Sequence, residues 1–262
     1  MALLEVANLS KRFGGLLAVS DLSFAVADRE ILSMIGPNGA GKTTAFNCVT
    51  GLFPITSGDV RLDGVSIAGL APHRITTLGI ARTFQNIRLF SFMTALDNVM
   101  VGAHWWMKER VWDGALRTRR SRSEERSVQE LAFDLLDQLG IARYAGSYAR
   151  ELPYGLQRRL EIARALATQP RLLLLDEPAA GLNPQEKKEL MALISRLRDE
   201  GLTIFLIEHD MKVVMEVSDR IVVLDHGEKI TEGVPQEVRN NPQVIEAYLG
   251  QGAAATMGGG AA

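Results

Sequence analysis

The sequence predicts an α/β fold: a mainly parallel sheet with helices between its strands and a helical subdomain inserted into it. Continuous apolar runs of strand length occur at residues 31–35, 172–175, 203–207 and 221–224. Helical segments follow the first and second runs, at residues 41–49 and 184–198. Because strands that alternate with helices are typical of parallel sheets, these runs favour a parallel core.

The other segments differ from this pattern. Short strands are expected at residues 4–6 and 22–26, separated by the turn-like Phe13-Gly14-Gly15, and again at residues 57–64. From about Ala95 to Leu139 the sequence has a helical pattern and is polar and heavily charged. This block is the predicted helical insertion.

Composition sets the broad class of protein. At 262 residues, with 47% hydrophobic and 23% charged residues, the chain fits one soluble globular domain with an insertion. A formal net charge of -2 gives no electrostatic reason to expect nucleic-acid binding. The single cysteine, Cys48, excludes an internal disulfide and fits a reducing compartment. No apolar run approaches the roughly 18 residues of a spanning helix, and no secretory signal is recognisable, so we expect any membrane role to be peripheral.

A glycine-rich loop follows the apolar run at residues 31–35. Its sequence, GPNGAGKTT, matches G-x-x-x-x-G-K-[ST] between a strand and a helix, which a glycine-rich turn with a chance lysine would not explain. Glycines let backbone N–H groups wrap phosphate oxygens, the lysine supplies positive charge, and the first threonine hydroxyl completes Mg²⁺ coordination. We therefore expect a nucleoside triphosphate to be bound by Gly36, Pro37, Asn38, Gly39, Ala40, Gly41, Lys42, Thr43 and Thr44.

Two adjacent carboxylates follow the apolar run at residues 172–175. Asp176 is suited to hold Mg²⁺ through water, and Glu177 to polarise a water molecule for attack on the γ-phosphate as a general base. Taken alone, the pair fits a solvated strand end equally well. The phosphate loop favours the catalytic interpretation.

Further motifs follow in order along the chain. Gln85 lies in RTFQN, LPYGLQRRL begins at Leu152, AGLN begins at Ala180, and the sequence Glu-His-Asp contains His209. Each alone has an ordinary explanation, such as a surface amide for Gln85 or a loop histidine for His209. Together with the phosphate loop and the two carboxylates, the ordered set resembles the ATP-binding cassette (ABC) ATPases over nearly the whole chain.

This resemblance implies a fold and a division of the chain. It implies a phosphate-loop NTPase (RecA-like) core with a mainly parallel sheet, an N-terminal antiparallel β subdomain and an inserted α-helical subdomain. A single ATPase domain is expected at residues 1–250. Its parts would be the core at 1–90 and 166–235, the helical subdomain at 91–165 and a C-terminal helix at 236–250. Residues 251–262 are expected to form a disordered tail.

The resemblance also implies how ATP is held and cleaved. In this family two subunits sandwich ATP head to tail, so that Gly155 of the signature segment would face the γ-phosphate bound by the other subunit. His209 would hold the γ-phosphate or the attacking water, and Gln85 would contact Mg²⁺ and relay closure to a partner. Phe13 matches the position at which an aromatic ring stacks on adenine, although an aromatic residue at a strand end also fits a core position.

The signature segment departs from the family pattern. The usual Leu-Ser-Gly-Gly-Gln is replaced by Leu-Pro-Tyr-Gly-Leu at residues 152–156, which removes the serine hydroxyl and one glycine. Asn183 also stands where aspartate is common. We hypothesise that the site completed by this segment hydrolyses ATP more slowly, which mixed pairs carrying Glu177→Gln on one side would test.

Three longer segments narrow the resemblance. Residues 81–99, 154–166 and 244–250 are similar to the ATP-binding subunit of branched-chain amino-acid importers. That resemblance implies ATP and Mg²⁺ as cofactors, two transmembrane permease subunits, an indirect external solute-binding protein, and a homodimer or a heterodimer with a related ATPase. It implies a peripheral position on the cytoplasmic face of the inner or plasma membrane, without nucleic acid as a partner.

A cluster of tryptophans and arginines lies in the predicted helical subdomain. The three tryptophans occur at residues 105–112, and five arginines follow between Arg117 and Arg126. Such a segment suits a docking surface or the headgroup side of a membrane. A helix with inward-packed tryptophans and a solvated basic face is the favoured interpretation, because Glu124 and Glu125 dilute the charge.

Other functions remain as alternatives. Lipopolysaccharide-export ATPases and importers of urea or short amides share these loops and differ in their partners. Soluble ABC ATPases that act on DNA or ribosomes usually resemble two cassettes in one chain or carry long coiled coils, and the sequence resembles neither. A module that binds ATP without hydrolysing it is disfavoured by Glu177 and His209.

Overall fold

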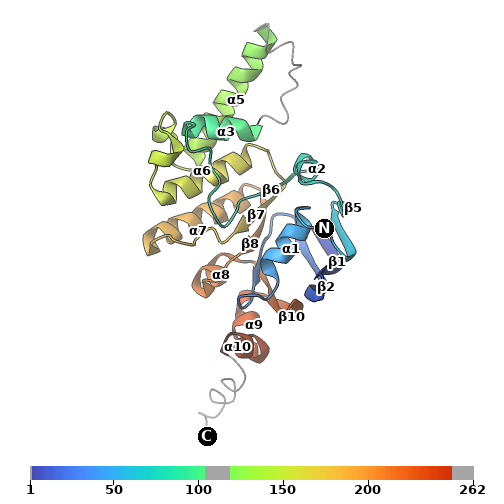
Figure 1. Cartoon of the computed structure of the whole chain (residues 1–262). Coiled ribbons are helices and arrows are strands. Elements are labelled where there is room, and N and C mark those ends of the chain that lie inside the picture. The colour runs from blue at the N-terminus through green and yellow to red at the C-terminus, as the bar shows by residue number, and fades with distance from the viewer. Residues whose placement is uncertain (1, 104–118, 250–262) are drawn as a thin grey trace.

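The computed structural model describes the backbone of residues 2–103 and 119–249, and the side chains of residues 2–103 and 124–248. Its elements form layers around a six-stranded sheet (Figure 1). Helices α6 (Tyr154–Leu166) and α7 (Pro184–Asp199) pack on one face of this sheet. Helix α1 (Lys42–Val49) and a four-stranded sheet cover the other face.

The six-stranded sheet is mainly parallel, as predicted. Its order is β10 (Glu228–Gly233), β9 (Arg220–Asp225), β3 (Ile31–Ile35), β8 (Thr203–Ile207), β7 (Leu172–Asp176) and β6 (Ile80–Arg82). Neighbours from β9 to β6 run parallel, and β10 pairs with β9 in the antiparallel sense. The phosphate loop leaves the end of β3 and the two carboxylates stand at the end of β7, two strands away. Carboxyl ends of parallel strands meet at one edge of the sheet, which is where ligands bind in open α/β folds.

Successive side chains of the central strands point to opposite faces of the sheet, and they therefore contribute to both core layers. Leu173 and Leu175 of β7 pack in the core that contains α6 and α7, whereas Leu172 and Leu174 pack in the core that contains α1. All of these side chains are fully buried. A strand that is apolar on both faces is therefore buried on both faces, as the continuous apolar run predicted.

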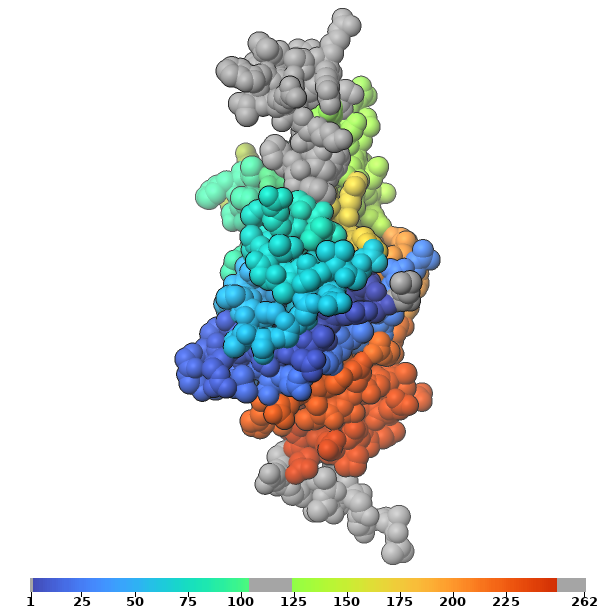
Figure 2. Space-filling model, turned by 90° about the vertical axis from the view of Figure 1, so that its right-hand side faces the viewer, coloured from blue at the N-terminus to red at the C-terminus, as the bar shows by residue number. Residues whose placement is uncertain are grey.

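The N-terminal strands form the expected antiparallel sheet. Its order is β2 (Leu16–Ala27), β1 (Ala2–Phe13), β4 (Ser57–Leu62) and β5 (Val65–Ser66). The β1–β2 hairpin turns at Gly14, whose φ of 55° is unfavourable for residues with a side chain. In Figure 2 these strands, drawn in blue and cyan, cover one side of the molecule, directly above the C-terminal elements.

The remaining helices lie at the two ends of the molecule and beside the sheet (Figure 1). They are α2 (Pro72–Thr77), α3 (Ala95–Ala103), α5 (Arg119–Gln138), α8 (Met211–Val217), α9 (Pro235–Arg239) and α10 (Pro242–Leu249), with 3₁₀ turns at Ala142–Tyr144 and Ala149–Glu151. Among the described residues between β6 and β7, helices α3, α5 and α6 pack together. Within the described ranges no helix has the length and apolarity that crossing a bilayer requires.

Two sequence predictions lie outside the described residues. They are the three tryptophans with the first of the arginines that follow, and the disordered tail at 251–262. The described side chain at the end of the arginine run, Arg126, is exposed and pairs with Glu130 at 3.1 Å (Nε to Oε1). This pairing fits a solvated helix face.

Candidate active site

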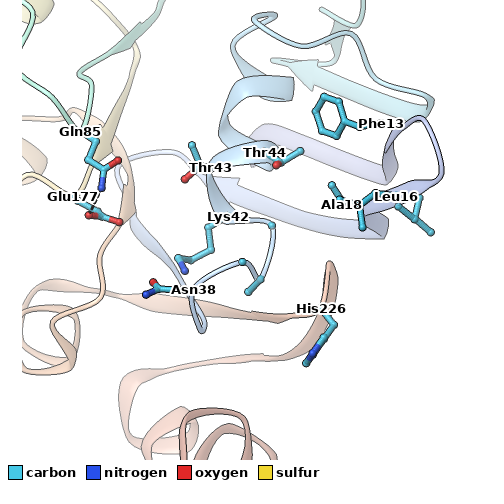
Figure 3. Close-up of a pocket in the computed structure, with 14 residues that line it drawn as sticks. Phe13, Leu16, Ala18, Asn38, Lys42, Thr43, Thr44, Gln85, Glu177 and His226 are labelled. Atoms are coloured by element: carbon cyan, nitrogen blue, oxygen red, sulfur yellow. Dashed lines mark hydrogen bonds between the residues drawn. The ribbon is translucent and has the colours of Figure 1, made fainter.

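A pocket of about 570 Å³ opens where the phosphate loop, the end of β7 and the β1–β2 turn meet. Figure 3 shows Lys42, Thr43 and Thr44 on one side of it, Gln85 and Glu177 opposite, and Phe13 at its rim. Its lining residues are Phe13, Leu16, Leu17, Ala18, Asn38, Gly39, Ala40, Gly41, Lys42, Thr43, Thr44, Gln85, Glu177 and His226. The fold thus brings residues from five separate segments to one cavity.

Glycines shape the loop between β3 and α1 for steric reasons. Gly36 has φ of 151°, and a side chain there would collide with the carbonyl oxygen of Leu224 on β9. Gly41 has φ of 100°, and a Cβ there would lie 2.6 Å from the carbonyl oxygen of Ala18. The loop is consequently packed tightly against Leu224 and Ala18, while its residues 38–44 line the pocket. This arrangement is what close approach to a large anion requires.

Lys42 places a cation inside the loop. Its side chain is mostly buried, and Nζ donates to the carbonyl oxygens of Gly36 at 2.7 Å and Pro37 at 2.9 Å. Burial lowers the pKa of Lys42, whereas the carboxylates of Glu177 and Asp176 oppose that shift. The two carbonyls hold the ammonium group at the pocket until a stronger anionic partner is available.

Asp176 lies behind the pocket and is paired. Its side chain is 4% exposed, and Oδ2 accepts a hydrogen bond from Nη2 of Arg82 at 2.7 Å. Burial raises the pKa of Asp176, and the Arg82 guanidinium counteracts this. Nη1 of Arg82 donates to Asn47 Oδ1 at 2.6 Å, so one arginine joins β6, the end of β7 and helix α1. A buried carboxylate needs such a partner to remain charged.

Glu177 is the carboxylate that faces the pocket. It has φ of 48°, an uncommon value for a residue with a side chain, and its N–H donates to the carbonyl oxygen of Ile207 at 2.9 Å. Gln85 Nε2 donates to Glu177 Oε2 at 2.9 Å. His209 Nδ1 lies 3.6 Å from the same oxygen. The geometry brings together the three residues that the sequence assigned to hydrolysis.

A buried carboxylate organises the loops on either side of Glu177. Glu208 is fully buried and accepts hydrogen bonds from the N–H of Ala179 at 2.8 Å and the N–H of His209 at 3.1 Å. Burial raises the pKa of Glu208, and these N–H groups oppose the shift. Glu208 therefore fixes the backbone before His209 to the backbone after Glu177.

Phe13 stands at the rim of the pocket with part of its ring free. It is 41% exposed, meets the ring of Phe53 edge to face at 5.2 Å between centroids, and has Lys11 Nζ 4.7 Å from its own centroid. A half-exposed ring held by a second ring offers a flat apolar surface for another planar group.

Two families match this chain. The family described as ABC transporter matches residues 19–180, which is more than half of the chain. The chain belongs to the ABC transporter family. A second family, described as branched-chain amino acid ATP-binding cassette transporter, matches residues 228–254. The chain is thus an ABC ATPase, and the family implies ATP hydrolysis.

Known relatives of this ABC ATPase match it nearly end to end. Over 250 residues it is 50% identical to BraF, the high-affinity branched-chain amino acid transport ATP-binding protein of Pseudomonas aeruginosa, covering 95% of this chain and 98% of BraF. The ADP conformation of MJ1267, an ATP-binding cassette of an ABC transporter, superposes with a TM-score of 0.83 at 30% identity, covering 96% and 100% of the two chains. A dimeric post-hydrolysis structure of MJ0796, bound to ADP and Pi, has a TM-score of 0.75 at 26% identity and covers 88% and 98%.

The pocket of this ABC ATPase does not collect every predicted site residue. Phe13, Lys42, Gln85 and Glu177 line it together with residues 38–44. Gly36, Pro37, Asp176 and His209 support it from behind or beside. Gly155 lies in the first turn of α6 and does not line the pocket of its own chain.

Two residues of the site were missed by sequence reasoning. Arg82 pairs with Asp176, and His226 lines the pocket from the β9–β10 turn. The turn-like Asp-His-Gly at residues 225–227 was a weak signal for His226. For Arg82 the only signal was its place in the segment that contains Gln85.

Proposed function

We propose that this ABC ATPase powers the uptake of branched-chain or related amino acids, working in a head-to-tail pair with a second ATPase subunit. The observation that carries the proposal is the position of Glu177, which faces the phosphate-loop pocket and is held by Gln85. Similarity to BraF over nearly the whole chain, and the family match at residues 228–254, support the transport role.

In the proposed reaction Glu177 acts as the general base. It accepts a proton from a water molecule that attacks the γ-phosphorus, and the bond to the bridging oxygen of the leaving ADP breaks. The loop N–H groups and Lys42 stabilise the negative charge on the phosphates. His209 Nδ1 lies 3.6 Å from Glu177 Oε2, and in the proposed reaction it holds the γ-phosphate or the water while Gln85 orients the Glu177 carboxylate.

Mg²⁺ fits the oxygen donors around this pocket. Thr43 is exposed at the start of α1, Gln85 carries an amide oxygen, and the buried Asp176 would act through water. Hydroxyl, carboxylate, amide and water oxygens, together with phosphate oxygens, are the ligands that Mg²⁺ prefers. When bound, the ion would neutralise charge that develops on the phosphates.

Removal of Mg²⁺ is therefore expected to lower the hydrolysis rate at least about a hundredfold, because a cation on phosphoryl oxygens supplies several kcal/mol of transition-state stabilisation. The measurement is phosphate release in the presence of a chelator, followed by addition of excess Mg²⁺. Hydrolysis that continues unchanged in the chelator would rule out the metal role.

Loss of the Phe13 ring is expected to weaken ATP binding. Stacking of a base on an aromatic side chain is worth about 1–3 kcal/mol, so Phe13→Ala should raise the Kd for ATP at least about fivefold. Phe13→Tyr keeps the ring and should bind like the wild type. Equilibrium binding of a fluorescent ATP analogue measures both variants, and equal affinities for Phe13→Ala and the wild type would remove the stacking role.

The start of α6 is proposed to complete the ATP site of the other subunit. Gly155 lies in the first turn of this helix, where backbone N–H groups lack partners within the helix and the dipole favours an anion. No residue of the signature segment (152–156) lines the pocket of its own chain, and the dimeric structure of MJ0796 supports a role across an interface.

A groove beside Gln85 is the proposed contact for a permease subunit. It has a volume of about 620 Å³ and lies between β6, the end of α3 and α6, with Arg82, Arg88, Phe90 and Arg164 in its lining. The Arg164 guanidinium lies 5.6 Å from the Phe90 ring centroid. Such cation–aromatic surfaces are typical of interface cores. We propose a peripheral position on the cytoplasmic face of the membrane, with this groove as the contact.

Co-purification tests the partners. Tagged protein that carries Glu177→Gln is purified with ATP from solubilised membranes, and the proteins that accompany it are identified. We expect hydrophobic permease subunits and a related ATPase or a second copy of this chain. Recovery of ribosomes or DNA without a membrane protein would contradict the transport proposal and leave the ATPase chemistry intact.

A further inference from the structure

We propose that Tyr154, Arg158 and Glu161 are positioning residues that fasten the glutamine loop (residues 84–88) to the signature helix (α6). Through them, contact of the signature segment with the ATP of the other subunit sets the position of Gln85 against Glu177 in the same chain. The inference rests on the proposed head-to-tail pair of ATPases.

Arg158 makes the central contacts. It is fully buried, and its Nη1 donates to the carbonyl oxygen of Phe84 at 2.7 Å while Nη2 donates to the carbonyl oxygen of Gln85 at 2.8 Å. One guanidinium group therefore holds two successive peptide groups of the glutamine loop. A planar group with five N–H donors is suited to such a fixed geometry.

Glu161 holds the same loop from the next turn of the helix. Its Oε2 accepts from Arg158 Nη1 at 2.8 Å, and its Oε1 accepts from the N–H of Phe84 at 3.5 Å and of Arg88 at 3.3 Å. Both side chains of this ion pair are almost completely buried. Burial raises the pKa of Glu161, and Arg158 opposes that shift. A buried ion pair stays paired, so the loop and the helix are expected to move as one body.

Tyr154 extends the contact to the segment after Glu177. Its hydroxyl accepts from Arg158 Nη2 at 3.3 Å, and a Cβ at Gly181 would lie 3.1 Å from Tyr154 Cε1. A Cβ at Gly155 would likewise lie 2.8 Å from Oε1 of Glu186. The half-exposed tyrosine that departs from the usual signature pattern thus contacts both Arg158 and the segment at Gly181 of its own chain.

These contacts join the two half-sites of one chain. The signature segment belongs to the ATP site of the other subunit, whereas the glutamine loop carries Gln85, whose Nε2 binds Glu177 of its own site (Figure 3). Arg158 contacts the backbone of Gln85 directly. A shift of α6 on meeting nucleotide would therefore move Gln85 and change how Glu177 is held.

The test needs variants that break the link and still fold. Replacing both members of a buried ion pair by apolar residues of similar volume is often neutral for stability, so Arg158→Met together with Glu161→Met removes the contacts without leaving a buried charge. Tyr154→Phe removes only the hydroxyl of a half-exposed side chain and serves as a second, milder variant. Thermal unfolding and the Kd for ATP of each full-length variant check that the fold and its own phosphate loop are intact.

Mixed dimers with two different tags separate action within a chain from action across the interface. In the reference dimer one chain carries Glu177→Gln, so hydrolysis uses Glu177 of the wild-type chain. The link variant is the chain with Arg158→Met and Glu161→Met. In the separated dimer these two substitutions are placed in the chain with the intact Glu177. In the combined dimer they are placed in the chain that already carries Glu177→Gln.

We expect the separated dimer to hydrolyse ATP at least about tenfold more slowly than the reference, because misplacement of a catalytic group by about 1 Å costs up to a hundredfold. The combined dimer should stay within about twofold of the reference. With Tyr154→Phe the separated dimer should again hydrolyse ATP more slowly than the combined dimer, but by a smaller factor. Equal losses in both arrangements, a loss confined to the combined dimer, or no loss would overturn the proposal.

The wild-type chain alone keeps the two proposals distinguishable. Hydrolysis at the full rate by a monomeric wild-type chain would count against the head-to-tail pair itself, because its site would then need no signature segment from a second subunit. Amide hydrogen exchange of the unpaired chain tests the link between the glutamine loop and α6 independently of the dimer. Exchange at residues 84–88 should become faster in the Arg158→Met, Glu161→Met variant and stay unchanged elsewhere. Unchanged exchange at residues 84–88 would refute the link on its own.

Discussion

Replacement of Glu177 by glutamine is expected to lower kcat for ATP hydrolysis by about a hundredfold to ten-thousandfold, the range that general acid–base catalysis contributes. The change removes the proton acceptor and keeps the shape of the side chain, so Gln85 Nε2 still finds an amide oxygen in place of the carboxylate. The Kd for ATP should change little, because the phosphate loop is untouched. Single-turnover phosphate release and equilibrium nucleotide binding measure the two quantities separately.

Glu228 provides the matched control for this variant. It is an exposed glutamate on β10 and does not line the pocket, so Glu228→Gln should leave both kcat and the Kd for ATP unchanged. If Glu177→Gln kept most of the wild-type rate, another group would have to be the base and the assignment of Glu177 would be wrong.

The second large effect is expected at Lys42. Truncating one partner of a buried charge pair costs about 2–5 kcal/mol, so Lys42→Met should raise the Kd for ATP at least about thirtyfold and abolish measurable hydrolysis. Burial lowers the pKa of Lys42 in the nucleotide-free protein, which indicates that the ammonium group is held there at a cost. The melting temperature of the variant without nucleotide should therefore be equal to that of the wild type or higher.

Lys188, exposed on α7, is the control for this substitution. Lys188→Met should bind ATP normally, and its melting temperature should be no higher than that of the wild type. Stabilisation by ATP distinguishes the variants further, because a ligand that binds only the folded state raises its melting temperature. A Lys42→Met protein with the same ATP-induced shift as the wild type would contradict the role of Lys42 in phosphate binding.

Local patterns were enough to predict the strands and loops that build the pocket. The runs at residues 31–35 and 203–207 became β3 and β8 with the same bounds, because each is apolar on both faces and ends at turn or cap residues. The helix predicted at residues 184–198 became α7, which begins with a capping box between Asn183 and Glu186. The substitution of Asn183 for a common aspartate thus keeps a good helix cap.

The supporting contacts could not be predicted because they depend on packing between segments far apart in the chain. Arg82 and Arg158 resemble surface arginines in sequence, since charged residues are rarely buried unless paired. Both are buried, and their partners Asp176 and Phe84 lie more than seventy positions away. His226 reaches the pocket only because the β9–β10 turn packs on the phosphate loop, where the N–H of Gly227 donates to the carbonyl oxygen of Ala40 at 3.1 Å.

The most direct test of the whole account is solute uptake in cells whose own copy of this gene has been deleted. Radiolabelled leucine, isoleucine and valine are supplied, and uptake is compared between cells that express the wild-type chain and cells that express equal amounts of Glu177→Gln. We predict high-affinity uptake with the wild type and a return to the level of the deletion strain with the variant. Uptake that is unaffected by the deletion, or that Glu177→Gln restores fully, would contradict the claim that ATP hydrolysis at this site drives branched-chain amino-acid import.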